Sequence, residues 1–137
     1  MSDLLLRVLF FGMLGVSLEL LFVALRQSWK TKNKALIGHA SLFMFPIYGL
    51  GLTFGFDIIE FVIPYTIVRW LSYPFWIWMI EIAVGSLAVK RGIRIWDYRY
   101  LPKLFHWKGI ISFAHLPVWI MFGMTVEFFR NTLLVMG

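Results

Sequence analysis

The sequence lacks cysteine and contains few charged residues. None of the 137 residues is cysteine, and only 15% are charged. The absence of cysteine excludes disulfides, cysteine metal sites and a thiol nucleophile. A hydrophobic content of 61%, combined with so little charge, excludes an ordinary soluble globular domain. The composition therefore predicts a protein whose main solvent is the lipid bilayer.

Several catalytic signatures are also missing from the sequence. It has no glycine-rich loop ending in Lys-Ser or Lys-Thr, no Gly-x-Ser-x-Gly turn and no His-Glu-x-x-His helix. The three histidines, His39, His106 and His115, show no i, i+4 spacing, so we expect no metal site. We expect no cofactor either, and an ATP-driven role would need another subunit.

Four apolar stretches predict four membrane spans. A bilayer core about 30 Å thick needs about 20 apolar residues per helix. The stretches cover residues 4–25, 40–56, 71–89 and 109–129. The predicted fold class is all-α, a polytopic membrane helical bundle forming a single integral membrane domain over residues 1–137. Because no small-residue cleavage pattern follows the first stretch, we expect it to be a retained helix.

Two regions between and within these spans are predicted to be irregular. The second span contains Pro46 and three glycines, which favour a kinked or partly unwound helix. Residues 57–70 are apolar but interrupted by two acids, a proline and an arginine, and they are too few to cross unaided. We therefore expect an interfacial or re-entrant segment between the second and third spans.

The basic residues predict an orientation in the membrane. Residues 26–34 hold four of the thirteen lysines and arginines, and residues 90–108 hold six. With four spans both loops lie on one face, which the positive-inside rule makes cytoplasmic, with both termini on the opposite side. The membrane could be a plasma, inner or endomembrane type. A fifth crossing at 57–70 would nearly abolish this bias. Since topology explains the basic loops, we expect membrane lipids as partners and no nucleic acid.

Three carboxylates within the predicted spans are the first candidates for an intramembrane polar site: Glu19, Glu81 and Glu127. A charge at this depth normally faces the bundle interior, a water-filled cavity or a partner. Each glutamate has a glycine four residues away on the same helix face, which predicts a closely packed face. The glycines are Gly15, Gly85 and Gly123. The three acids could converge on one polar interior or be staggered like the steps of a relay.

These glutamates admit three interpretations that the sequence leaves open. They could be buried, hydrogen-bonded groups that specify helix packing, members of a proton or cation pathway or an acid/base pair, or partners of basic residues on another subunit. His115 in the fourth span joins this polar group, with a buried hydrogen-bonding role as the simplest interpretation.

A second candidate site lies in the basic loop, where aromatic and charged side chains alternate. Its members are Arg94, Trp96, Asp97 and Tyr98, followed by Arg99. One interpretation is an interfacial anchor with a local Asp–Arg pair. The other is a site for a lipid headgroup or a partner protein.

Several of these features together resemble the transmembrane protein 229 family. They are the stretch from Gly15 to Glu19, residues 38–49 with their Phe-Pro-Ile-Tyr-Gly run, Glu81 with Gly85, the Ile-Trp-Asp-Tyr run at 95–98, and Gly109. The family shares this pattern with bacterial chains labelled putative type IV ABC-transporter components (CmpB-like). The likeness covers residues 11–127 and is looser in the fourth span. It implies a multi-pass fold with four helices, and it adds Tyr48 to the intramembrane candidates.

The leading functional hypothesis from the sequence is a transport-related or complex-forming membrane component with a polar intramembrane site. It would act with a partner subunit or as a homo-oligomer. The rival is a lipid-handling or lipid-modifying enzyme that uses Glu19 and Glu81 as general acid and base. A third hypothesis is a structural assembly factor. Whether the protein is an enzyme stays open.

Overall fold

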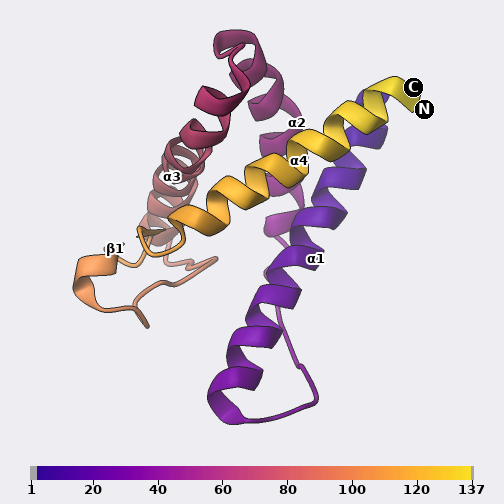
Figure 1. Cartoon of the computed structure of the whole chain (residues 1–137). Helices are drawn as coiled ribbons and strands as arrows, with labels where there is room; N and C mark the ends of the chain where they lie inside the picture. The colour runs from indigo at the N-terminus through magenta and orange to yellow at the C-terminus, as the bar shows by residue number, and fades with distance from the viewer. Residues whose placement is uncertain (1–2, 137) are drawn as a thin grey trace. The chain divides into compact units, whose positions relative to one another are not determined.

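A computed structural model describes residues 3–136 and shows an all-α protein with four long helices (Figure 1). The helices are α1 (Asp3–Thr31), α2 (Met44–Val62), α3 (Thr66–Lys90) and α4 (Leu116–Met136). All four are long and apolar enough to cross a membrane. The predicted fold class is confirmed, and the chain is a multi-pass integral membrane protein.

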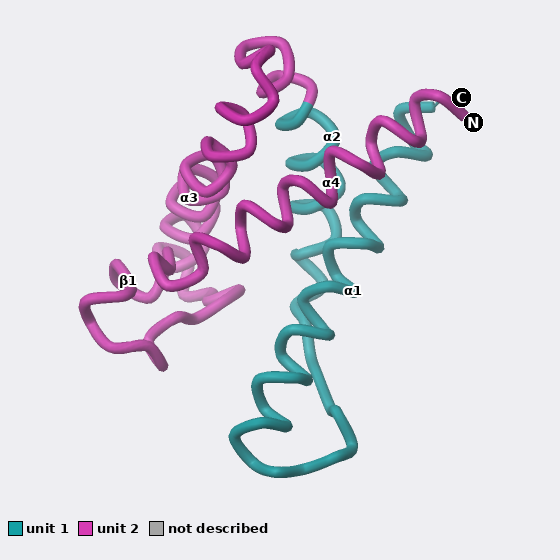
Figure 2. The backbone as a smooth tube through the Cα atoms, viewed as in Figure 1, with its two compact units in different colours: residues 1–56 teal, residues 57–137 magenta. Residues whose placement is uncertain are grey.

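The chain divides into two compact units, residues 1–56 and 57–137, coloured separately in Figure 2. The boundary falls inside α2, so each unit is described by itself. The expectation of a single domain over 1–137 stays a prediction.

In the first unit, α1 packs closely against the start of α2 and against the segment that precedes it. A Cβ at Gly49 of α2 would lie 2.7 Å from the Val8 carbonyl oxygen, and one at Gly12 would lie 2.9 Å from the Phe45 ring. Before α2 begins, Gly38 lies directly against the Leu20 carbonyl. Glycines at these positions therefore let backbone approach backbone.

The second helix is not interrupted by its proline, contrary to the sequence prediction. α2 begins at Met44, so Pro46 occupies the first turn, where its missing N–H costs no helical hydrogen bond. The amide of Phe43 instead bonds the Ser41 hydroxyl oxygen, and the amide of Met44 bonds the Ser41 carbonyl. The helix then runs without a break to Val62.

The structure also corrects the separate interfacial or re-entrant segment predicted over residues 57–70. Residues up to Val62 belong to α2, and those from Thr66 belong to α3, leaving a turn of three residues. The charges that interrupt this apolar stretch are paired within the second unit, as described below. Pairing removes the main cost of carrying them on long apolar helices.

In the second unit, α3 and α4 pack antiparallel, with Tyr73 opposite Gly123 and Arg69 opposite Glu127. The predicted fourth span began at residue 109, but α4 begins only at Leu116. Pro117 explains this start, because it lacks the N–H that a longer helix would need at this position, whereas in the first turn the missing N–H costs no helical bond.

Residues 91–115 form a folded loop in place of the first turns predicted for the fourth span. Gly92, at φ +74°, ends α3, and a short 3₁₀ turn (Lys103–Phe105) leads into strands β1 (His106–Trp107) and β2 (Ile111–Ser112). The strands pair antiparallel around Lys108 and Gly109, whose φ values are 52° and 70°. Two consecutive positive φ angles are typical of a tight hairpin turn.

Candidate functional site

The polar side chains that the sequence placed in two separate groups meet in the second unit. Loop residues 91–115 lie along the second half of α3, and they bring Tyr98 to Glu81 and place His115 beside Tyr98. We call Glu81, Tyr98, Ser112 and His115 the loop site. It joins a residue from the middle of a membrane-length helix to three residues of one loop.

Short polar contacts and ring contacts connect the members of the loop site. The Tyr98 hydroxyl donates to Glu81 Oε1 at 2.7 Å. The Tyr98 ring lies 5.5 Å from the His115 ring, centroid to centroid. Ser112 Oγ lies 2.5 Å from His115 Nδ1. Glu81 is 8% exposed and Ser112 is fully buried, while Tyr98 and His115 are half-buried, so the site combines a buried carboxylate and hydroxyl with a partly accessible phenol and imidazole.

Backbone contacts along α3 hold the loop in this position. A Cβ at Gly85 would lie 2.7 Å from the Ile110 side chain and 3.1 Å from the Trp96 ring, so the glycine makes room for both. Trp96 Nε1 donates to the Ile110 carbonyl at 2.7 Å, and Trp78 Nε1 donates to the Ser112 carbonyl at 3.0 Å. The Trp78 indole thereby ties the loop backbone to α3, and the Trp96 indole ties two parts of the loop to each other.

The charged members of the loop candidate turn to each other instead of to Glu81. Arg99 donates twice to Asp97 at 2.9 Å through Nε and once at 2.6 Å through Nη2, while Arg94 lies 3.7 Å from the same carboxylate. The hydrogen bonds from Arg99 hold the pKa of Asp97 below its usual range. The local Asp–Arg pair predicted from the sequence is therefore confirmed.

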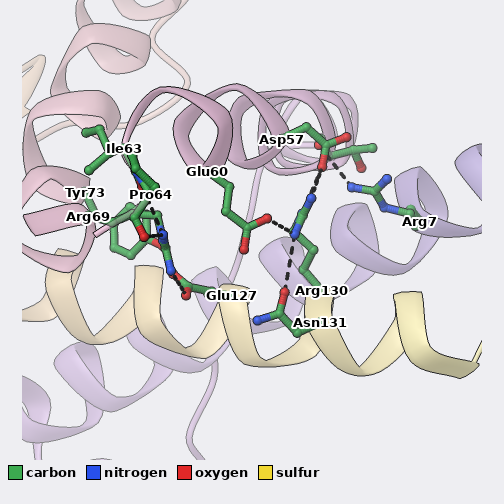
Figure 3. A network of polar contacts seen from close by, with 11 residues as sticks. Arg7, Asp57, Glu60, Ile63, Pro64, Arg69, Tyr73, Glu127, Arg130 and Asn131 are labelled. Atoms are coloured by element: carbon green, nitrogen blue, oxygen red, sulfur yellow. Dashed lines mark hydrogen bonds and ion pairs between the residues drawn. The ribbon is translucent and has the colours of Figure 1, made fainter. Parts of the chain in front are cut away.

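Glu127 belongs to a different polar cluster, shown in Figure 3, in which Arg69 neutralises it. Arg69 Nη2 and Nε contact the two Glu127 oxygens at 2.6 and 3.0 Å, and Tyr73 donates its hydroxyl to the same carboxylate. The third guanidinium nitrogen, Nη1, donates to the Ile63 and Pro64 carbonyls at 2.9 and 3.2 Å. The bidentate pair links α3 to α4, and the bonds from Nη1 link Arg69 to the turn that follows α2.

A second arginine pairs the two acids near the end of α2. Arg130 Nε donates to Asp57 at 2.8 Å, and Arg130 Nη1 contacts both Glu60 and Asn131 (Figure 3). Asp57 and Glu60 are three residues apart, so both lie on one face of the helix. The two arginines and three carboxylates of this region are therefore matched within the second unit itself.

Glu19 lies in the first unit, where Tyr48 is its hydrogen-bond partner. The Tyr48 ring packs directly on Gly15, one turn before Glu19 on α1. Arg26 and His39 also act on the Glu19 carboxylate electrostatically. Gly123 and Glu127 of the second unit are arranged in the same way: the Tyr73 ring packs on Gly123, and the Tyr73 hydroxyl donates to Glu127.

These contacts decide one of the alternatives left open by the sequence. The predicted faces are confirmed, since the glycine and the glutamate of each helix contact the same neighbouring tyrosine or the same loop. A single convergent interior is wrong for Glu81 and Glu127. Glu127 pairs with Arg69, twelve residues from Glu81 along α3, which is about 18 Å at 1.5 Å per residue. These two acids are staggered.

Three participants had no clear signal in the sequence. Ser112 was hidden in a predicted span, and Arg69 was assigned to an interfacial segment. Tyr73, which is fully buried against Gly123, was not among the candidate residues. Throughout residues 3–136, no three histidine, aspartate or glutamate side chains are grouped so as to hold a metal ion.

Comparison with known proteins gives no further guidance. No family model matches the sequence, and no solved structure matches the chain. Any function proposed for the protein therefore rests on the residues of the site and their contacts.

Proposed function

We propose that the protein is a transport-related membrane component that binds the polar headgroup of an amphiphile at the loop site. The headgroup would enter from the bilayer and contact Glu81, Tyr98 and His115. The protein would act with a partner subunit or as a homo-oligomer. The resemblance to the transmembrane protein 229 family agrees with this role.

The observation that carries the proposal is the loop packed along α3. Four residues of the loop contact α3 between Trp78 and Gly85, which is five to twelve residues before the end of the helix at Lys90; they are Trp96, Tyr98, Ile110 and Ser112. At 1.5 Å per residue this is about 8 to 18 Å along a helix long enough to span the bilayer. Irregular backbone at such depth is tolerated only where protein buries it or where it lines a polar cavity. In transporters, non-helical backbone at membrane depth lines substrate and ion sites.

The hydrogen-bond partners of Glu81 suit a bound headgroup better than those of Glu127. Glu127 is held by a bidentate arginine, an arrangement that suits a structural contact. Glu81 instead accepts a hydrogen bond from the Tyr98 phenol, and the Tyr98 ring lies beside the His115 imidazole; phenol and imidazole can both donate and accept hydrogen bonds. Side chains of this kind suit a polar headgroup with mixed donors and acceptors.

The orientation in the membrane is part of the proposal. Loops 32–43 and 91–115 would lie on the cytoplasmic side, with both termini opposite, because ten of the thirteen basic residues lie in or beside these loops. The cysteine-free sequence makes the test simple. Lys34→Cys and Lys103→Cys should react with an impermeant maleimide from one side of sealed vesicles, and Tyr65→Cys from the other. Reaction of all three from the same side would contradict this topology.

Native mass spectrometry of the gently extracted protein tests the binding function. We expect a retained amphiphile in the natural protein, loss of that mass in Tyr98→Phe, and retention in Tyr65→Phe. Tyr65 is the matched control because it is an exposed tyrosine in the turn between α2 and α3. The same retained molecules in all three proteins would rule out a role for the loop site, and a fixed protein partner in the spectrum would identify a subunit.

One contact favours a lipid-modifying enzyme as a second candidate. Ser112 Oγ lies 2.5 Å from His115 Nδ1, within the distance expected for a nucleophile and its base. Ser112 is fully buried, however, so this reaction would require the loop to move. Incubation of the purified protein with a lipid extract, followed by lipid analysis, separates the candidates: Ser112→Ala should abolish turnover if the protein is an enzyme.

A further inference from the structure

We infer that the outer edge of loop 91–115 is a docking site for anionic lipid. The edge consists of Leu104, Phe105 and Trp107 with Lys103 and Lys108 on either side. We call it the lysine–aromatic edge. It is separate from the loop site, and the inference does not depend on the proposed function.

The apolar side chains of the edge are presented outward by a fixed backbone. Leu104 is 82% exposed, Phe105 44% and Trp107 40%. The hairpin turn at Lys108 and Gly109 closes with a hydrogen bond from the Ile110 amide to the Trp107 carbonyl at 2.9 Å. The Phe113 amide donates to the Phe105 carbonyl at 2.9 Å, which ties the 3₁₀ turn to the chain beyond β2. The lysine–aromatic edge is therefore exposed on a backbone that hydrogen bonds hold in place.

Positive charge lies on and beside these rings. The Lys108 ammonium stands 4.7 Å from the centroid of the Trp107 ring, and Lys103 opens the 3₁₀ turn. Arg94 and Arg99 are committed to Asp97, which is the one acidic residue between residues 82 and 126. The edge therefore carries two lysines with no acidic side chain of its own.

The chemistry of the edge matches the surface of an anionic bilayer. Tryptophan and other large rings favour the headgroup level, where an apolar body meets water, and lysines add attraction to anionic headgroups. Nucleic acid would match the charge but not the exposed Leu104 and Phe105 side chains. Trp29 and Lys32 repeat the pairing in the first unit, with the ammonium 5.2 Å from the ring centroid.

Tryptophan quenching in vesicles tests the inference on the full chain. The Trp107 signal is the difference between the natural protein and Trp107→Phe. Vesicles of phosphatidylcholine contain a minor share of brominated phosphatidylglycerol or, in the control, brominated phosphatidylcholine. We expect stronger quenching of Trp107 by the anionic lipid. In Lys103→Gln/Lys108→Gln the preference should fall about fivefold per lysine at low ionic strength. The matched control, Lys90→Gln/Arg91→Gln, removes the same charge at the end of α3 and should keep most of the preference.

Salt provides a second readout, because exposed charges are screened over about 8 Å at physiological ionic strength. The preference should fall as salt is added, while quenching by brominated phosphatidylcholine should stay constant. Three results would overturn the inference: equal quenching of Trp107 by both lipids, equal loss of preference in both double variants, or no quenching of Trp107 by either lipid. The last result would mean that water or another protein covers the edge.

Discussion

Replacement of Arg69 by methionine tests the buried ion pair of the second unit. The change removes both guanidinium contacts to Glu127 but leaves the carboxylate buried with Tyr73 alone. Loss of one member of a buried pair costs about 3 to 5 kcal/mol, because the other charge is left uncompensated. The Ile63 and Pro64 carbonyls also lose a donor. We therefore expect a loss of about 3 to 5 kcal/mol in the free energy of unfolding.

The double variant Arg69→Met/Glu127→Met separates the charge from the packing. With both charges removed, most of the lost stability should return, and the buried Tyr73 hydroxyl should leave a deficit of about 1 to 3 kcal/mol. The assay is unfolding by sodium dodecyl sulfate in mixed micelles, followed by circular dichroism. Arg99→Met is the control, because it breaks an exposed ion pair and should change stability little.

Two results would refute this reasoning. One is an Arg69→Met variant as stable as the natural protein, which would mean that the pair contributes nothing to helix packing. The other is a double variant at least as unstable as the single one, which would mean that the loss comes from packing volume instead of the unpaired carboxylate.

Three further predictions concern the glycines, the loop site and pH. Gly123→Ala should lower the free energy of unfolding by about 1 to 3 kcal/mol through overpacking, whereas Gly55→Ala, which meets nothing within 4 Å, should be neutral or stabilising in the same micelle assay. Tyr98→Phe and Glu81→Gln should be coupled in a double-mutant cycle, with a loss of about 1.5 to 3 kcal/mol for removal of the hydroxyl; additive effects would contradict the contact. The pKa of Asp97 is lowered from its ordinary 3.8, so its ion pairs stabilise the loop above that pH and stop doing so as the pH falls through the lowered pKa. Because the pair with Arg99 is exposed, this loss should be small; thermal unfolding at a series of acidic pH values should show it in the natural protein and not in Asp97→Asn.

The sequence alone predicts the four helices, because the apolar run that indicates each one is a local feature of the chain. A run of about 20 apolar residues predicts a span wherever it occurs, and all four runs became helices. A glycine four residues from a glutamate predicts a packed face by helix geometry alone, and Gly15, Gly85 and Gly123 all pack as expected.

The errors arose where distant residues decide the structure. Residues 57–70 were predicted to be a separate interfacial or re-entrant segment, because the sequence does not show that Arg69 and Arg130 pair with carboxylates 58 and 73 residues away. The start of the fourth helix was placed too early, because apolar residues 109–115 pack as a hairpin against α3 instead of continuing the helix. The sequence placed Tyr98 and Glu81 in separate groups, because only the path of the loop brings them together.

Photo-crosslinking in bilayers is the most direct test of whether a headgroup binds at Glu81, Tyr98 and His115. The protein would be reconstituted with a lipid carrying a diazirine beside its headgroup, illuminated, digested and mapped by mass spectrometry. If a headgroup binds at the loop site, adducts should form on peptides that contain Tyr98 and His115. These adducts should be lost in Glu81→Gln and retained in Tyr65→Phe. Adducts spread along the exposed faces of all four helices and unchanged by Glu81→Gln would contradict it.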